Sequence, residues 1–205
     1  NIKFELLILS LITVSIFITF GPDLFFYNYF NDLNQNIDSV FLKDFFKDIT
    51  RLGDSFWYFI ISIIGFTIFY IIERFQIIKN KSKKKISNFF ISSFFYILTV
   101  GIITQFAKHI IGRPRPNYTN FEEVFDFKFF TLESNYHSFP SGHSSTVFIV
   151  CFILVAAFPK LKYFFYFLAS IVALSRVVVG AHFFTDIIAG GILALISFKV
   201  LNKFV

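Results

Sequence analysis

Six apolar stretches separated by short charged segments constrain the fold of this chain more than any other feature. They cover residues 4–20, 55–72, 89–106, 144–158, 163–179 and 187–201. A helix needs about 20 mostly apolar residues to cross a bilayer. Charged residues make up only 16% of the 205-residue chain and gather between the stretches, too few to cover six apolar helices with a polar layer. The sequence therefore predicts an all-α, polytopic membrane protein whose single domain, residues 1–205, holds six transmembrane helices.

The positions of the lysines predict the orientation of these helices. Lysines gather between the second and third stretches, between the fourth and fifth, and at the end of the chain: Lys79, Lys81, Lys83, Lys84, Lys85, Lys160, Lys162, Lys199 and Lys203. If six helices alternate across a membrane, all of these lie on one side, which the positive-inside rule identifies as cytoplasmic. Both termini are then cytoplasmic too. The net charge of +6 is explained by this topology and by anionic lipid headgroups, and we expect no nucleic-acid partner.

Three segments then face outward, residues 21–54, 107–143 and 180–186. In the first of them, Phe41, Phe45, Ile49 and Leu52 recur at helical spacing beside a charged face. This pattern is typical of a helix that lies in the membrane interface. We expect such a helix between the first and second transmembrane helices, where it either lines a lipid entrance or anchors the segment at the headgroups.

Polar and ionisable residues are costly near membrane helices, so those that do occur call for an explanation. They form four groups: Lys108 with Arg113-Pro114-Arg115-Pro116, Pro140-Ser141-Gly142-His143, Ser175-Arg176, and His182 with Asp186. The orientation inferred from the lysines places all four groups at the outer face. We therefore expect them to share one site.

Several of these residues are suited to bind a phosphate. Lys108, Arg115 and Arg176 offer ammonium and guanidinium donors for its oxygens. Ser141 and Gly142 stand where the fourth helix begins, so that free backbone N–H groups and the positive end of the helix dipole face the same anion. Together they predict a phosphate cradle.

The two histidines of the site have different neighbours. His182 and Asp186 are four residues apart, which places them on one face of a helical turn. A carboxylate that accepts a hydrogen bond from one imidazole nitrogen leaves the other nitrogen free to attack. His182 is therefore the predicted nucleophile, and His143 the predicted general acid that later activates water.

A metal site is the competing chemical interpretation, because His143, His182 and Asp186 could bind a transition ion. The three nearby cations would oppose its positive charge. We therefore expect catalysis with neither a metal ion nor another cofactor.

These residues resemble the type 2 phosphatidic acid phosphatase family, whose three-part signature matches without a gap. Its parts correspond to Lys108 with Arg115 and Pro116, to Pro140 through His143, and to Ser175 and Arg176 with His182 and Asp186. The resemblance implies a phosphohistidine on His182 supported by Asp186, general acid catalysis by His143, and phosphate binding by Lys108, Arg115, Ser141, Gly142 and Arg176. The six-residue spacing after Lys108 selects Arg115. Arg113 is then expected to be exposed to solvent, with contact to a second phosphate or a lipid headgroup as the alternative.

The same resemblance implies a lipid substrate. Bacterial members of the family act on undecaprenyl pyrophosphate, phosphatidylglycerophosphate, phosphatidic acid or lipid A phosphates. We expect a lipid phosphatase of the bacterial inner membrane with its active site on the extracytoplasmic face, and the oligomeric state stays open. Transfer of the phosphoryl group to another lipid is an alternative, as is a carrier or scramblase that binds lipid phosphates without chemistry.

Overall fold

The computed structural model describes residues 21–35, 40–75, 82–119 and 124–203. Within these residues all regular elements are helical, which confirms the all-α prediction. The longer helices are α2 (Pro22–Gln35), α3 (Val40–Thr50), α4 (Ser55–Arg74), α5 (Ser82–Ile111), α6 (Gly142–Ala157), α7 (Lys162–Val178) and α8 (Phe184–Leu201). Short 3₁₀ turns, η2 (Arg51–Gly53), η4 (Ser134–Tyr136) and η5 (Pro159–Leu161), connect or precede them.

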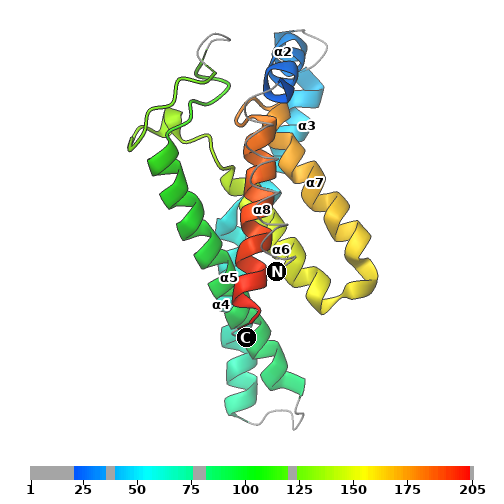
Figure 1. Ribbon diagram of the computed structural model, residues 1–205. Coiled ribbons are helices and arrows are strands. Elements are labelled where there is room, and N and C mark those ends of the chain that lie inside the picture. The colour runs from blue at the N-terminus through cyan, green and yellow to red at the C-terminus, as the bar shows by residue number, and fades with distance from the viewer. Residues whose placement is uncertain (1–20, 36–39, 76–81, 120–123, 204–205) are drawn as a thin grey trace, which may run out of the picture.

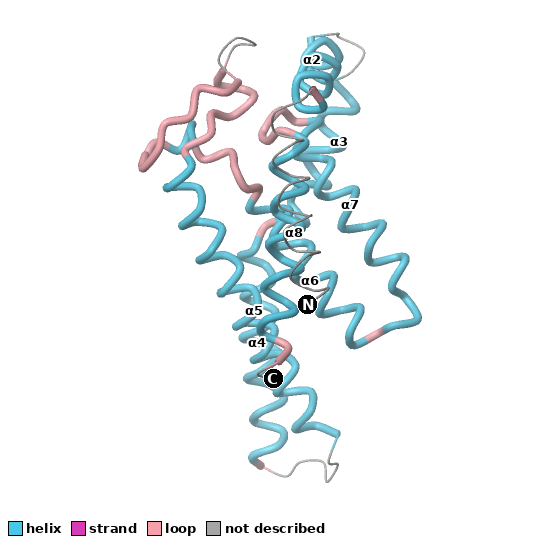
Figure 2. Tube along the Cα trace, viewed as in Figure 1, coloured by secondary structure: helices cyan, strands magenta, loops and turns pink. Residues whose placement is uncertain are grey.

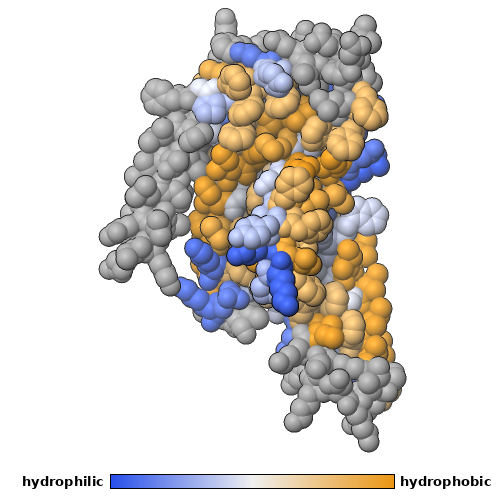
Figure 3. Space-filling view, turned by 90° about the vertical axis from the view of Figure 1, so that its right-hand side faces the viewer, coloured by the Kyte–Doolittle hydropathy of each residue, from blue (hydrophilic) through white to orange (hydrophobic). Residues whose placement is uncertain are grey.

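Four helical stretches of the described residues are long and apolar enough to cross a membrane: Lys43–Arg74, Ile86–Ile111, Pro159–Val178 and Phe184–Leu201. A shorter apolar helix, Gly142–Ala157, accompanies them. Apolar side chains cover most of the described surface on the face shown in Figure 3. The chain is therefore a multi-pass membrane protein. The apolar stretch predicted at residues 4–20 lies outside the described residues, so the count of six membrane helices stays a prediction.

The helices form an elongated bundle (Figure 1). Helices α4 and α5 form one antiparallel pair, and α6 packs against both α7 and α8. Helices α2 and α3 lie at the end of the bundle where α7 ends and α8 begins (Figure 1). The long connection from α5 to α6, drawn as loop in Figure 2, folds back over the same end. The predicted polar groups thus stand at helix ends that meet on one side of the molecule.

Close packing in the body of the bundle fixes these helix ends. Tyr96, Ile97 and Val100 of α5 are buried against Ile149 and Ile153 of α6, in a cluster that also includes Ala194 of α8. At Gly190 of α8, a side chain would come within 2.6 Å of the Ser141 carbonyl oxygen. The absence of a side chain there lets α8 lie directly against the start of α6, where the second polar group is found.

Helix α5 is longer at both ends than its apolar stretch, and Lys108 lies within its last turn rather than after it. The helix ends at Gly112, which has a φ of +60° and whose N–H donates to the Lys108 carbonyl at 3.0 Å. A glycine in this conformation commonly terminates helices. The Gly112 carbonyl accepts from the Lys128 N–H at 2.8 Å, so the long connection is fastened to the end of α5.

Candidate active site

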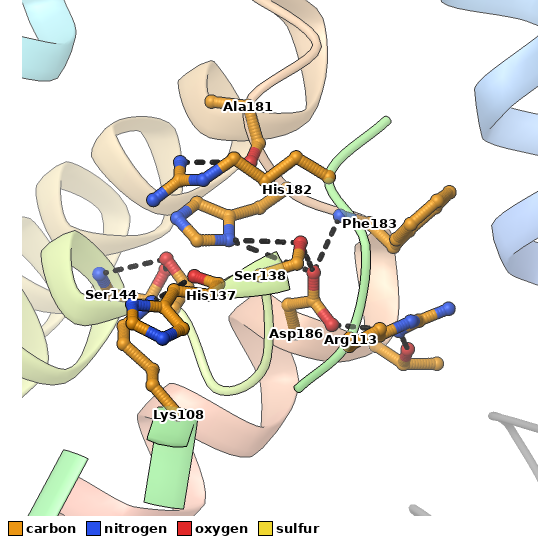
Figure 4. A network of polar contacts seen from close by, with 12 residues as sticks. Lys108, Arg113, His137, Ser138, Ser144, Ala181, His182, Phe183 and Asp186 are labelled. Atoms are coloured by element: carbon orange, nitrogen blue, oxygen red, sulfur yellow. Dashed lines mark hydrogen bonds and ion pairs between the residues drawn. The ribbon is translucent and has the colours of Figure 1, made fainter. Parts of the chain in front are cut away.

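His182 and Asp186 lie side by side at the start of α8 (Figure 4). The His182 Nδ1 is 3.6 Å from the Asp186 Oδ2, and 3.5 Å from the hydroxyl of Ser138. Ser138 donates to the same carboxylate oxygen at 2.5 Å, and the Phe183 N–H does so at 2.9 Å. These contacts hold the Asp186 carboxylate toward Nδ1, which leaves Nε2 on the opposite side of the ring as the nitrogen available for attack.

The His182 ring is almost fully buried, with 2% of the residue exposed. The pKa of His182 is lowered to about 3, mainly by this burial, with the charges of Lys108 and Arg176 acting in the same direction and Asp186 opposing them. The imidazole is therefore neutral near pH 7. A neutral ring has a free lone pair, which a nucleophile requires.

Arg113 does not occupy the solvent-exposed position expected from the sequence. It is 0% exposed. Its Nη1 donates to the Asp186 Oδ1 at 2.7 Å, and its Nη2 donates to the Asp23 Oδ2 at 2.7 Å. The expectation was wrong because Asp23, which is distant in sequence, supplies a second buried carboxylate. Although burial by itself lowers the pKa of Arg113, the two carboxylates raise it above its ordinary value.

Lys108 is buried and points from α5 toward the start of α6. Its Nζ donates to the His137 carbonyl oxygen at 2.6 Å. Its Cε lies 3.9 Å from the position that a Cβ on Gly142 would take. The ammonium group therefore lies beside the first residue of α6, as a shared phosphate site requires.

The two predicted phosphate-binding arginines are both held by hydrogen bonds to neighbouring segments. The Arg115 Nε donates to the Ser134 carbonyl at 3.1 Å, and its Nη1 to the Ala181 carbonyl at 3.4 Å. The Arg176 Nη1 donates to the Thr50 hydroxyl at 2.8 Å. The Arg176 Nε is buried and has no hydrogen-bond partner among the described residues. A buried donor without a partner is costly, and an anion in the site would satisfy it.

Ser141 caps α6 and turns its side chain inward. Its hydroxyl accepts from the Ser144 hydroxyl at 3.0 Å, and its own N–H donates to the Asp186 carbonyl at 3.0 Å. The next two N–H groups, of Gly142 and His143, occupy the first positions of α6, where no intrahelical acceptor exists. These groups are the ones suited to receive an anion, whereas direct phosphate binding by Ser141 stays a prediction.

His143 is held by η2, the turn that precedes α4. A Cβ on Gly53 would lie 2.9 Å from the His143 Cβ and 3.0 Å from its Cδ2, so the imidazole packs directly against this glycine. Burial lowers the pKa of His143 to about 4 in the absence of a bound anion, and the charges of Arg176, Lys108 and Arg115 act in the same direction. Because Lys108 and Arg176 also act on His182, both histidines stand close to one group of cations.

Several residues of the site carry no signal in the predicted motifs. Ser138 binds Asp186, Thr50 holds Arg176, Gly53 supports His143, and Asp23 pairs with Arg113. Only Ser138 could have been suspected, from its position two residues before Pro140. The other three come from residues 23–54, whose role the sequence left open.

His109 and His137 lie outside the predicted motifs, and the structure places them together. Their rings meet edge to face with centroids 4.4 Å apart, and each has a nitrogen 3.1 Å from the Thr131 carbonyl oxygen. His137 is buried in the connection between α5 and α6, and its carbonyl is the group that accepts from Lys108. The pair therefore supports the site through the backbone.

The described residues offer no suitable set of ligands for the metal site considered as an alternative. In the part of the chain that the structure describes, no three histidine, cysteine, aspartate or glutamate side chains are grouped so that they could hold a metal ion. Asp186, the only carboxylate of the proposed three ligands, is already bound by Arg113, Ser138 and the Phe183 N–H.

Comparison with solved structures agrees with the fold. The crystal structure of a transmembrane PAP2-type phosphatidylglycerolphosphate phosphatase from Bacillus subtilis superposes with a TM-score of 0.66, covering 97% of this chain and 93% of that chain at 22% sequence identity. The crystal structure of Aquifex aeolicus LpxE gives a TM-score of 0.52 over 86% of this chain and 93% of that one, at 19% identity.

Comparison of sequences identifies relatives with closer identity. Lipid A 1-phosphatases of Rhizobium johnstonii and Rhizobium etli are 34% and 33% identical over 69% and 73% of this chain. The matches span 59% and 65% of the length of those two proteins. Phosphatidylglycerophosphatase B of Bacillus subtilis is 32% identical over 50% of this chain and 51% of its own length. Residues 89–205, which hold both histidines and all three cations of the site, match the PAP2 superfamily, and the chain belongs to that superfamily.

Proposed function

We propose that this protein is a lipid phosphatase, which hydrolyses a phosphate monoester or pyrophosphate of a membrane lipid through a phosphohistidine on His182. The observation that carries the proposal is the pairing of a buried, neutral His182 with Asp186 beside the cations Lys108, Arg115 and Arg176. Relatives named as lipid A 1-phosphatases and as phosphatidylglycerophosphatase B support a lipid substrate. Lipid A and phosphatidylglycerophosphate are therefore the first substrates to test.

In the first step, the Nε2 of His182 attacks the phosphorus atom and the bond from phosphorus to the lipid oxygen breaks. The negative charge of the bound phosphate favours the protonated form of His143, which donates this proton to the departing oxygen, so that the lipid leaves as an alcohol, or as a lipid monophosphate if the substrate is a pyrophosphate. The His182 ring, now bonded to phosphorus and still protonated at Nδ1, carries a positive charge. Asp186 stabilises this charge from 3.6 Å away, a distance that can shorten when substrate binds.

In the second step, the unprotonated His143 accepts a proton from a water molecule, which attacks the phosphorus on His182. The bond between phosphorus and Nε2 breaks, inorganic phosphate forms, and His182 returns to its neutral state. The three cations and the first N–H groups of α6 stabilise the negative charge on the phosphoryl oxygens in both steps. This charge stabilisation comes from side chains and backbone, and the reaction as proposed requires no metal ion.

We place the site on the extracytoplasmic side of a bacterial inner membrane. This placement rests on the lysines between the apolar stretches, which the positive-inside rule assigns to the cytoplasm. The site lies at the opposite helix ends. Cysteine accessibility tests the placement: a cysteine in place of exposed Leu132 should react with a membrane-impermeant maleimide on intact spheroplasts, and a cysteine in place of exposed Lys160 should not.

The function is tested with purified protein in detergent, offered lipid A, phosphatidylglycerophosphate, phosphatidic acid and undecaprenyl pyrophosphate. We expect phosphate release from at least one lipid, inhibition by orthovanadate, and no effect of EDTA. H182A should lose at least about 1,000-fold in kcat while still binding the lipid. A phosphorylated acceptor lipid in place of free phosphate would indicate a transferase, and H182A with full activity in lipid movement between vesicles would indicate a carrier.

A further inference from the structure

A buried group of charges lies behind the proposed nucleophile, on the side away from the phosphate cradle. Arg113 sits between two carboxylates, and its guanidinium donates at 2.7 Å to both Asp186 and Asp23. Arg113 and Asp186 are 0% exposed and Asp23 is 1% exposed. In Figure 4, Asp186 lies between Arg113 and His182, so that Arg113 reaches the histidine only through Asp186.

Asp23 comes from α2 and accepts hydrogen bonds from Thr185 as well as from Arg113. Its Oδ1 accepts from the Thr185 N–H at 2.8 Å, and its Oδ2 accepts from the Thr185 hydroxyl at 2.5 Å. Thr185 precedes Asp186 directly at the start of α8, and its hydroxyl also accepts from the Arg113 Nη1 at 2.8 Å. One carboxylate of α2 therefore fixes both the arginine and the backbone that carries Asp186.

The apolar surroundings strengthen the charge interactions within this group. The guanidinium lies over the Phe183 ring at 4.1 Å, so the group is screened by apolar side chains rather than by water. Charge interactions are stronger at such low dielectric than they are in water. Arg113 alone would cancel the negative charge of Asp186. With Asp23 included, the three side chains carry one net negative charge next to His182.

This net charge is relevant to the first step of the proposed reaction, on which the inference rests. His182 is neutral before it attacks, and its ring is positively charged once the bond from Nε2 to phosphorus has formed. We propose that Arg113 and Asp23 are positioning residues for this step. Arg113 holds the Asp186 carboxylate with its Oδ2 toward His182, and Asp23 balances Arg113 so that the charge of Asp186 remains available to the ring.

The competing explanation is that Asp23 only attaches α2 to the bundle. Tyr27 provides the comparison, because it attaches the same helix without adding a charge: its hydroxyl donates to the Thr119 carbonyl at 3.0 Å. If attachment alone mattered, Y27F and D23N would have similar effects on the reaction.

The experiment compares wild type, Y27F, D23N and the double variant D23N/R113Q in detergent, with folding checked by size exclusion and thermal unfolding. We expect D23N to lower kcat by at least about 10-fold with KM within about twofold of wild type, since neither residue contacts the phosphate. Y27F should keep the wild-type kcat. The double variant restores one net negative charge beside His182 but weakens the hold of Arg113 on Asp186, so its kcat should lie between those of D23N and wild type.

Each result has a definite meaning. A kcat of D23N equal to that of wild type, or a double variant slower than D23N, overturns the inference. If D23N does not fold, R113K is tested in its place. Lysine keeps the charge of arginine but cannot hold two carboxylates at once, so kcat should fall while KM stays unchanged. An unchanged kcat of R113K overturns the inference. If wild type releases no phosphate from any lipid, the proposed function fails and the inference with it, whereas an active wild type with a fully active D23N removes the inference alone.

Discussion

The side chain of His143 lies so close to Gly53 that no side chain at position 53 would fit between them. A methyl group at Gly53 would lie 2.9 Å from the His143 Cβ. We predict that G53A displaces His143 and lowers kcat by up to about 100-fold, since small errors in the position of a catalytic group cost this much. Phosphate release from the preferred lipid measures the effect.

Gly101 provides the control for this substitution, because a Cβ at that position meets nothing within 4 Å. It lies in α5, where alanine is also favoured over glycine. G101A should therefore leave kcat unchanged. Equal activities of G53A and G101A would show that the contact between Gly53 and His143 does not position the proposed general acid.

Thr50 connects α3 to the proposed phosphate site, because its hydroxyl accepts from the Arg176 Nη1 at 2.8 Å. T50V keeps the shape of the side chain and removes the acceptor. We expect KM to rise by about 10-fold, as a hydrogen bond to a charged group is lost and the arginine is less well placed. T67V is the matched control, since the Thr67 hydroxyl only bonds to the Ile63 carbonyl on the exposed side of α4. A KM of T50V equal to that of T67V would contradict the role of Thr50.

The buried neutral state of His182 makes the unliganded protein less stable in acid. The pKa of His182 is about 3 in the folded protein, against about 6.5 for an unfolded chain. Between these values the unfolded chain binds a proton that the folded chain does not, so the free energy of unfolding falls as the pH falls, by about 1.4 kcal/mol per pH unit. Above about pH 6.5 this histidine contributes no pH dependence.

The measurement is the apparent unfolding temperature of wild type and of H182N in detergent, at about pH 7 and about pH 5. Wild type should lose more stability than H182N between the two conditions, because the variant has no imidazole to protonate at this position. Parallel losses in the two proteins would show that His182 is not neutral in the folded state.

Gly112 fastens the long connection between α5 and α6 to the end of α5. It has a φ of +60°, and a Cβ there would lie 1.7 Å from the Lys128 carbonyl oxygen. Backbone strain from a Cβ at positive φ costs about 1–2 kcal/mol. G112A adds a steric clash to this strain, so it should lower the unfolding temperature by more than strain alone would. G21A supplies that baseline, because Gly21 also has a positive φ but has open space around it. Equal unfolding temperatures of G112A and G21A would mean that Lys128 moves away from the added methyl group without loss of stability.

The helices could be predicted because apolar stretches in a membrane protein map directly onto helices. The stretch at residues 55–72 became α4 and the stretch at 187–201 became α8, each with small differences at the ends. Helix α5 is longer than the apolar stretch at residues 89–106 because hydropathy detects only the apolar part of a helix and omits polar helical residues such as Lys108. The termination signal was present, since Gly112 and Pro114 are the first residues there that interrupt a helix.

The site was only partly predictable, and the reason is again physical. His182 and Asp186 follow a local spacing, whereas Asp23 and Arg113 are 90 residues apart and meet only because α2 packs on the start of α8. A single sequence contains no signal for such a contact. The expectation that Arg113 is solvated therefore failed, and the same applies to Thr50, which is 126 residues from Arg176.

The location of the polar site at one end of an apolar bundle affects how the two proposed products separate. Inorganic phosphate is soluble in water and insoluble in hydrocarbon, and the dephosphorylated lipid has the opposite preference. The ion would diffuse into the aqueous compartment while the lipid stays in the leaflet. Since the products enter different phases, hydrolysis at this boundary would proceed with little recombination, even where the lipid product accumulates.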